Sequence, residues 1–172
     1  MRRTDLMSAL VLVSLLALSG CSGEDKSYST PSSICGVSVD KDALKGLLPA
    51  GNKLTVKASA NHEKPETRFC NVIVDGDIEL SSEGAWRKAG YTAKDAAEDA
   101  LAFNYRATGG GRYAVWDDGA ATVFDCRNSA QDAARFSVEF HVVHPQGKIE
   151  GKVERFIGDY AEAYRKTVSC EE

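Results

Sequence analysis

The sequence predicts an α+β domain in which an antiparallel sheet of about six strands packs with two or three helices. Three patterns lead to this prediction. Residues 134–143 alternate apolar and polar side chains, which is the period of a strand with one buried face. An Asp-Gly dipeptide separates apolar runs at residues 75–76 and again at 118–119, which favours hairpins. From residue 149 onward, apolar residues recur at spacings of three and four, which predicts a long amphipathic helix.

The first half of the domain gives one helix and three strands. Asp40 is a candidate N-cap for a short helix that stops at Pro49. Residues 53–60 alternate cleanly and predict a strand with one wet face. The runs 68–74 and 77–82 flank the first Asp-Gly dipeptide, so we expect two adjacent antiparallel strands there.

The second half repeats this order. Thr92 and Asp95 resemble a capping box, and we expect their helix to continue until the glycines 109–111 end it. Strands over 112–117 and 120–126 flank the second Asp-Gly dipeptide. The next strand is the clearest in the chain, and we expect its polar face to be open to water. The predicted order is therefore α-β-β-β-α-β-β-β-α, which suggests two halves of similar topology.

The N-terminus predicts a secretory signal peptide over residues 1–20. Two arginines precede an apolar run over 6–18 that is shorter than a comfortable membrane span. The exit Leu18-Ser19-Gly20-Cys21 resembles the lipobox of bacterial lipoproteins. This resemblance implies that the Cys21 thiol is joined to diacylglycerol, that the chain is cut just before it, and that the new N-terminus is acylated. The alternative is an ordinary signal peptide cut near a coincidental cysteine.

Residues 21–33 are small and polar, so we expect a lipid-anchored flexible tether, followed by a single disulfide-bonded domain over 34–172. Without residues 1–20 the chain has 19 basic and 24 acidic residues, a net charge of −5. This balance argues against a nucleic-acid partner and against a polybasic lipid-binding segment. We therefore expect attachment to the extracytoplasmic face of the cell membrane through the acyl chains.

Once Cys21 is assigned to lipid, an even set of cysteines remains: Cys35, Cys70, Cys126 and Cys170. In an oxidising compartment an even set favours two disulfides, and three pairings are possible. We favour Cys35 with Cys70 and Cys126 with Cys170, because each bond then closes a loop within one half of the chain. No two of them have the short spacing that is usual in a zinc site, so we expect no metal there.

The whole chain resembles the small actinobacterial cell-envelope lipoproteins grouped in families of unknown function, and its predicted topology is similar to the Mog1/PsbP-type sandwich. The resemblance depends on the lipobox, the polar tether, Ile-Cys-Gly-Val-Ser at residues 34–38, and the paired cysteines. It implies an exported, lipid-anchored, disulfide-bonded domain with a non-catalytic role.

No pattern singles out a catalytic or cofactor site. The chain has no G-x-S-x-G, and the glycines 109–111 lack the G-K-[ST] ending of a phosphate-binding loop. His62 lies in a polar loop, while His141 and His144 are three residues apart on or near a strand and so face opposite sides. The acidic pairs at the two hairpins are expected turn residues rather than calcium ligands, and no spacing marks a carboxylate pair for glycosidic cleavage. We therefore expect neither an enzyme nor a cofactor.

Aromatic residues give the strongest indication of binding. Five tryptophans and tyrosines cluster in the middle third of the chain: Trp86, Tyr91, Tyr105, Tyr113 and Trp116. Exposed aromatics beside acids and an arginine form a surface for a glycan or a peptide, so our candidate ligand-binding residues are Arg112, Trp116 and Asp117. The alternative is that Trp116 packs between a helix and the sheet.

The sequence thus predicts a binding or interaction module at the cell envelope, with a protein, peptide or glycan as its ligand. The alternative is an envelope hydrolase that acts on wall material. A deep cleft in which His141 meets a serine or a carboxylate would favour the hydrolase, whereas an apolar or aromatic patch would favour the binding module.

Overall fold

Nine strands and three helices form an α+β fold in residues 26–171, which are the residues that the computed structural model describes. They are β1 (Ser33–Ile34), β2 (Val37–Ser38), α1 (Lys41–Leu47), β3 (Leu54–Asn61), β4 (Thr67–Val74), β5 (Asp77–Arg87), α2 (Ala93–Asp99), β6 (Arg106–Thr108), β7 (Tyr113–Val115), β8 (Gly119–Asn128), β9 (Ala133–Val142) and α3 (Glu150–Arg165). The expected fold class is confirmed. The signal peptide and Cys21 lie outside the described residues.

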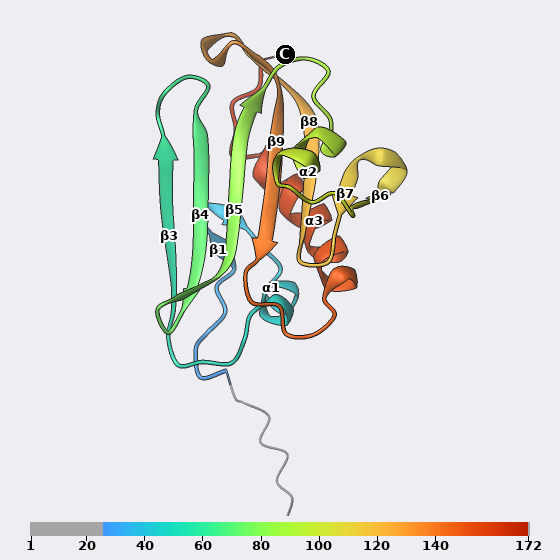
Figure 1. Cartoon of the computed structure of the whole chain (residues 1–172). Helices are drawn as coiled ribbons and strands as arrows, with labels where there is room; N and C mark the ends of the chain where they lie inside the picture. The colour runs from blue at the N-terminus through green and yellow to red at the C-terminus, as the bar shows by residue number, and fades with distance from the viewer. Residues whose placement is uncertain (1–25, 172) are drawn as a thin grey trace, which may run out of the picture.

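The main sheet has seven antiparallel strands in the order β3-β4-β5-β9-β8-β7-β6 (Figure 1). It joins two three-stranded meanders, β3-β4-β5 and β7-β8-β9, whose third strands pair at the centre from Leu80 opposite Val142 to Arg87 opposite Arg135. The expected similarity of the two halves therefore holds for the strands. It does not extend to the helices, because α1 packs with α3 on one face of the sheet and α2 packs on the other face.

The larger core lies between the sheet and the helices α1 and α3. Phe136 and Phe140 of β9 point into it, as the alternation predicts, and both are fully buried. The ring of Phe140 lies 4.9 Å from that of Phe156 on α3, in an edge-to-face arrangement. Each such aromatic stabilises the fold by about 1.5–3 kcal/mol through its buried area.

A smaller core lies under α2 on the other face. Its contacts are made by alanines of the helix and of β7 and β8, and by one tryptophan: Ala93, Ala96, Ala97, Ala114, Trp116 and Ala121. These small side chains let the helix approach the sheet closely. The helix packs mainly on the strands β7, β8 and β9. The polar face of β9, which we expected to be open to water, is therefore partly covered, and Ser137 is buried.

Helix α2 is shorter than expected. Its capping box at Thr92 and Asp95 is confirmed, but the helix ends at Asp99 rather than at the glycines. The Leu101 N–H donates to the Glu98 carbonyl at 3.0 Å and the Ala102 N–H to the Ala97 carbonyl at 2.8 Å. This is the Schellman pattern that ends a helix. The glycines 109–111 instead form the turn between β6 and β7.

The two Asp-Gly hairpins form for different reasons. Asp75 and Gly76 both have positive φ, as a two-residue hairpin turn requires. Gly119 already belongs to β8, and its φ is not positive. A Cβ atom there would lie 2.5 Å from the Phe140 carbonyl oxygen and 2.7 Å from the Trp116 ring. Close packing, not turn geometry, therefore requires glycine at position 119.

Both expected disulfides are present, Cys35–Cys70 and Cys126–Cys170. The first ties the β1–β2 hairpin to β4, and the second ties the C-terminus to β8. None of the helices within residues 26–171 is long and apolar enough to cross a membrane.

The domain begins before residue 34. The Ser27 N–H donates to the Gly51 carbonyl at 2.8 Å, and the Tyr28 hydroxyl donates to the Pro49 carbonyl. The part of the expected tether from Lys26 onward therefore packs on the domain.

Candidate functional site

The structure separates the three residues that the sequence nominated. Trp116 is only 4% exposed and packs under α2, which is the packing alternative. Arg112 and Asp117 are exposed, but Arg112 precedes β7 and Asp117 follows it. Five residues of mostly extended backbone separate them by roughly 16 Å. These residues do not form one surface, and the buried Trp116 ring offers no platform for a ligand.

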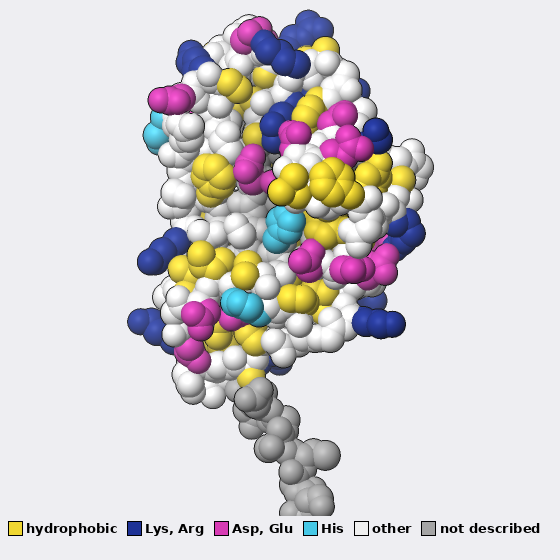
Figure 2. Space-filling model, viewed as in Figure 1, with side chains coloured by type: hydrophobic (Ala, Val, Ile, Leu, Met, Phe, Trp, Pro, Cys, Tyr) yellow, Lys and Arg dark blue, Asp and Glu magenta, His cyan; other side chains and the backbone are white. Residues whose placement is uncertain are grey.

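A different surface stands out on the α2 side of the sheet, where the helix leaves the strands β3, β4 and β5 uncovered (Figure 1). We call it the open face. It consists of side chains of β4, of β5 and of the neighbouring strand β9, together with two exposed apolar residues after α2: Phe69, Asn71, Ile73, Ser81, Glu83, Glu139, His141, Leu101 and Phe103. Figure 2 shows apolar and acidic side chains gathered around a histidine on this side of the molecule.

Two glutamates lie opposite one another at the centre of the open face. Glu83 of β5 is the direct cross-strand partner of Glu139 of β9. Burial, together with the neighbouring charge of Glu83, raises the pKa of Glu139 to about 7. Burial also raises the pKa of Glu83, and Asp99 adds to this shift. Like charges directly opposite on a sheet destabilise it, so this pair favours holding a proton near neutral pH.

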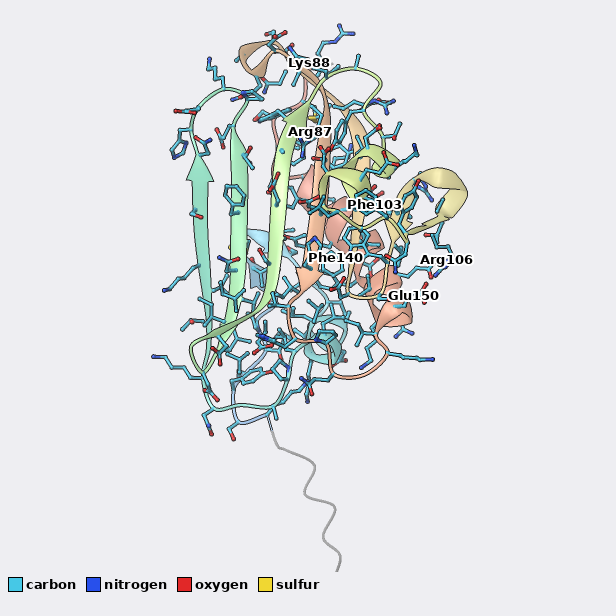
Figure 3. All side chains as sticks on the ribbon, in the orientation of Figure 1. Arg87, Lys88, Phe103, Arg106, Phe140 and Glu150 are labelled. Atoms are coloured by element: carbon cyan, nitrogen blue, oxygen red, sulfur yellow. A yellow bond between two sulfur atoms is a disulfide. The ribbon has the colours of Figure 1, made fainter. Side chains whose placement is uncertain are left out.

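Arg87, at the end of β5, partly offsets this negative charge (Figure 3). Its guanidinium lies 3.5 Å from the Glu83 carboxylate and 3.8 Å from that of Asp99. It also donates to the Ser137 hydroxyl at 2.9 Å and lies 4.6 Å from the centre of the Tyr91 ring. These contacts fix the arginine beside the acids.

His141 borders the glutamates on β9. Its ring lies 5.1 Å from that of Trp116, and burial lowers the pKa of the imidazole, while Asp118 opposes this shift. His144 lies after β9, is exposed, and approaches the buried Glu79 carboxylate at 3.4 Å. Within residues 26–171, no three side chains of His, Cys, Asp or Glu gather as a metal-ion site.

Leu101 and Phe103 provide the apolar part of the open face. Their exposed fractions are 75% and 74%, the largest among the exposed large apolar residues of the described chain. Figure 3 places Phe103 just below α2, in front of the sheet. Leu101 has φ +59°, in the left-handed region that a glycine normally occupies at this helix end. A leucine here is unfavourable twice over, because its backbone is strained and its side chain contacts water.

A scan against protein-family models and searches of curated proteins and of solved structures found no match. The resemblance to the actinobacterial lipoproteins and to the Mog1/PsbP-type sandwich therefore stays a prediction.

Sequence reasoning did not find the open face. The alternation puts Glu139 on the polar side of its strand, but Glu83 lies beyond residue 82, where the sequence predicts that the strand ends. Leu101 and Phe103 fall within the expected continuation of the helix. Leu101 follows Ala97 at helical spacing, and Ala102 between the exposed pair is buried under α2, so no sequence signal marks Leu101 and Phe103 as exposed.

Proposed function

We propose that this chain is a lipid-anchored binding module on the extracytoplasmic side of the cell membrane, and that its open face contacts a protein or peptide ligand. The observation that supports this most is the exposed pair Leu101 and Phe103. Exposed apolar patches beside polar residues mark interaction sites more often than scattered single side chains do. Backbone strain at Leu101 adds support, because strained residues cluster at functional sites.

The chemistry of the surface suggests what the ligand offers. Apolar side chains of the ligand would bury Leu101 and Phe103, each worth about 1.5–3 kcal/mol when fully buried. A lysine or arginine of the ligand would complement Glu83 and Glu139, and charge complementarity raises specificity and association rate. The expected ligand is therefore a polypeptide segment with apolar and basic side chains.

A pull-down from membranes tests this proposal. The intact lipoprotein is compared with the double variant Leu101→Ser/Phe103→Ser and with Asp159→Ser, which changes an exposed residue of α3 across the sheet. We expect a partner that the double variant loses at least tenfold and that Asp159→Ser retains. Equal capture by all three forms would count against the open face.

The lipid anchor is tested in the same membranes. Cys21→Ser removes the thiol that the lipobox resemblance assigns to diacylglycerol. We expect this variant to leave the membrane fraction and to appear in the soluble fraction, as fractionation and immunoblotting measure. A variant that stays in the membrane fraction would contradict the anchor at Cys21.

A second candidate is a hydrolase that acts on wall material, and the Glu83–Glu139 pair favours it. A carboxyl group that holds a proton near neutral pH can serve as a general acid. If this candidate is correct, the chain releases soluble sugars from isolated cell walls and Glu139→Gln lowers the rate at least 100-fold. If the unmodified chain releases no soluble sugars, the hydrolase is excluded and the binding module is the remaining proposal.

A further inference from the structure

A pocket of about 540 Å³ opens on the opposite side of the sheet from the open face, at the outer strands. It lies between the β1–β2 hairpin, the strands β3 and β4, and the C-terminal part of α3. Its apolar lining comes from small side chains, a disulfide and two tyrosines: Val37, Ala58, Ala60, Cys35, Cys70, Tyr160 and Tyr164. This volume falls within the range of small-molecule sites.

The pocket exists because no helix covers this corner of the sheet. Helix α3 packs on β7, β8 and β9 and against the β1–β2 hairpin. On the outer strands, Ala58 pairs with Cys70 and Ala60 with Arg68, so the floor beside α3 is built mainly from small side chains. The Cys35–Cys70 disulfide fixes the hairpin against this floor. The pocket is therefore formed before any ligand binds.

The polar groups of the pocket limit the charge of a ligand. The Arg68 guanidinium lies 2.8 Å from the Glu66 carboxylate, so the one cation at the rim is already neutralised. The Tyr160 hydroxyl shares a hydrogen bond with the Ser82 hydroxyl at 2.9 Å, so this polar group already has its partner. Transfer of an ionised ligand into such a lining would leave its charge unpaired, which is costly.

The walls favour a flat ring. Tyr160 and Tyr164 lie edge to face, 5.7 Å between ring centres, and are only 1% and 6% exposed, so they form the base of the pocket and offer a ligand a narrow strip of ring surface. Aromatic rings pack well in such offset and edge-to-face arrangements, and sulfur contacts aromatic rings favourably. The alanine methyl groups of the floor leave room for a planar body.

We propose that this pocket binds an uncharged, planar aromatic compound of two or three rings. The site is separate from the open face, and binding there does not depend on the function proposed above.

Titration with N-phenyl-1-naphthylamine, an uncharged aromatic compound that fluoresces in apolar surroundings, tests the proposal. The full chain is used as Cys21→Ser, purified without detergent. Ala60→Trp fills the pocket, and Lys57→Trp adds the same side chain to the other face of β3 as a matched control. We expect saturable binding, at least tenfold weaker in Ala60→Trp and unchanged in Lys57→Trp. Absence of binding, or equal loss in both variants, would overturn the proposal.

A second measurement keeps the proposal testable if Ala60→Trp does not fold. Nuclear Overhauser effects between the probe and the unmodified pocket report the site directly. We expect contacts from the probe to the methyl groups of Ala58 and Ala60 and to the Tyr164 ring. Contacts to Leu101 and Phe103 instead would place the probe on the open face and overturn the pocket assignment, while leaving the function proposed for that face intact.

Discussion

At Glu139, burial and the charge of Glu83 act in the same direction, since both penalise the ionised carboxylate. Arg87 offsets only part of this penalty. The folded pKa of about 7 exceeds the ordinary value of 4.5. The folded state therefore binds a proton that the unfolded state releases. This contribution to stability is fully present below pH 4.5 and is lost as the pH rises through 7.

The variant Glu139→Gln tests this balance. Glutamine keeps the shape without the charge, so the variant should gain stability relative to the unmodified chain as the pH rises from 5 to 8. At about 1.4 kcal/mol per pKa unit, we expect a relative gain of roughly 2 kcal/mol at pH 8. Urea unfolding at both pH values measures it. A difference that does not change with pH would contradict the raised pKa.

His141 provides the contrasting case. Because burial lowers its pKa, its contribution is present at high pH and is lost as the pH falls below the ordinary value of 6.5. This trend opposes that of Glu139. Comparison of the variant with the unmodified chain at each pH removes the histidine effect from the prediction above.

At the scale of elements, the way in which α2 ends determines the position of the exposed apolar residues Leu101 and Phe103. The Schellman hydrogen bonds place Leu101 in the left-handed region and turn the chain away from the helix. Phe103 follows two residues later and stays exposed. The helix itself was predictable from its capping box. Its end was not, because the sequence has Leu101 at the position where a glycine usually marks the end of a helix.

Leu101→Gly separates folding from binding. Glycine adopts positive φ freely and removes an exposed leucine, so the free energy of unfolding should rise by about 1 kcal/mol. Binding of the partner captured in the pull-down should weaken at least tenfold. Thermal unfolding and a binding titration measure the two effects. A variant that is more stable and binds equally well would show that Leu101 strains the fold without contributing to binding.

At the scale of the whole molecule, the sequence allowed prediction of the fold class, the meanders and both disulfides, because each depends on local periodicity or on cysteine spacing. The pairing of β5 with β9 was not predictable, since Glu83 and Glu139 are far apart in the chain. Trp116 illustrates the same limit. Its neighbours in sequence are acidic turn residues, yet the alanines of a distant helix bury it.

The two disulfides close loops of 35 and 44 residues, and each should contribute about 4 kcal/mol on a chain-entropy model. Replacement of either pair by alanines should lower the free energy of unfolding by this order. Only loss of Cys35–Cys70 should also weaken binding of the aromatic probe, because that bond lines the pocket. Urea unfolding and the fluorescence titration measure both effects. Equal weakening of probe binding by both replacements would contradict the local role.

The contact made by the open face is the central claim, and photo-crosslinking in intact cells tests it most directly. Phe103→p-benzoylphenylalanine places the reactive group on the open face, and Asp159→p-benzoylphenylalanine places it on the exposed side of α3, across the sheet. We expect a discrete crosslinked species from position 103 that is absent from position 159. No crosslink from position 103, or the same species from both positions, would contradict the account.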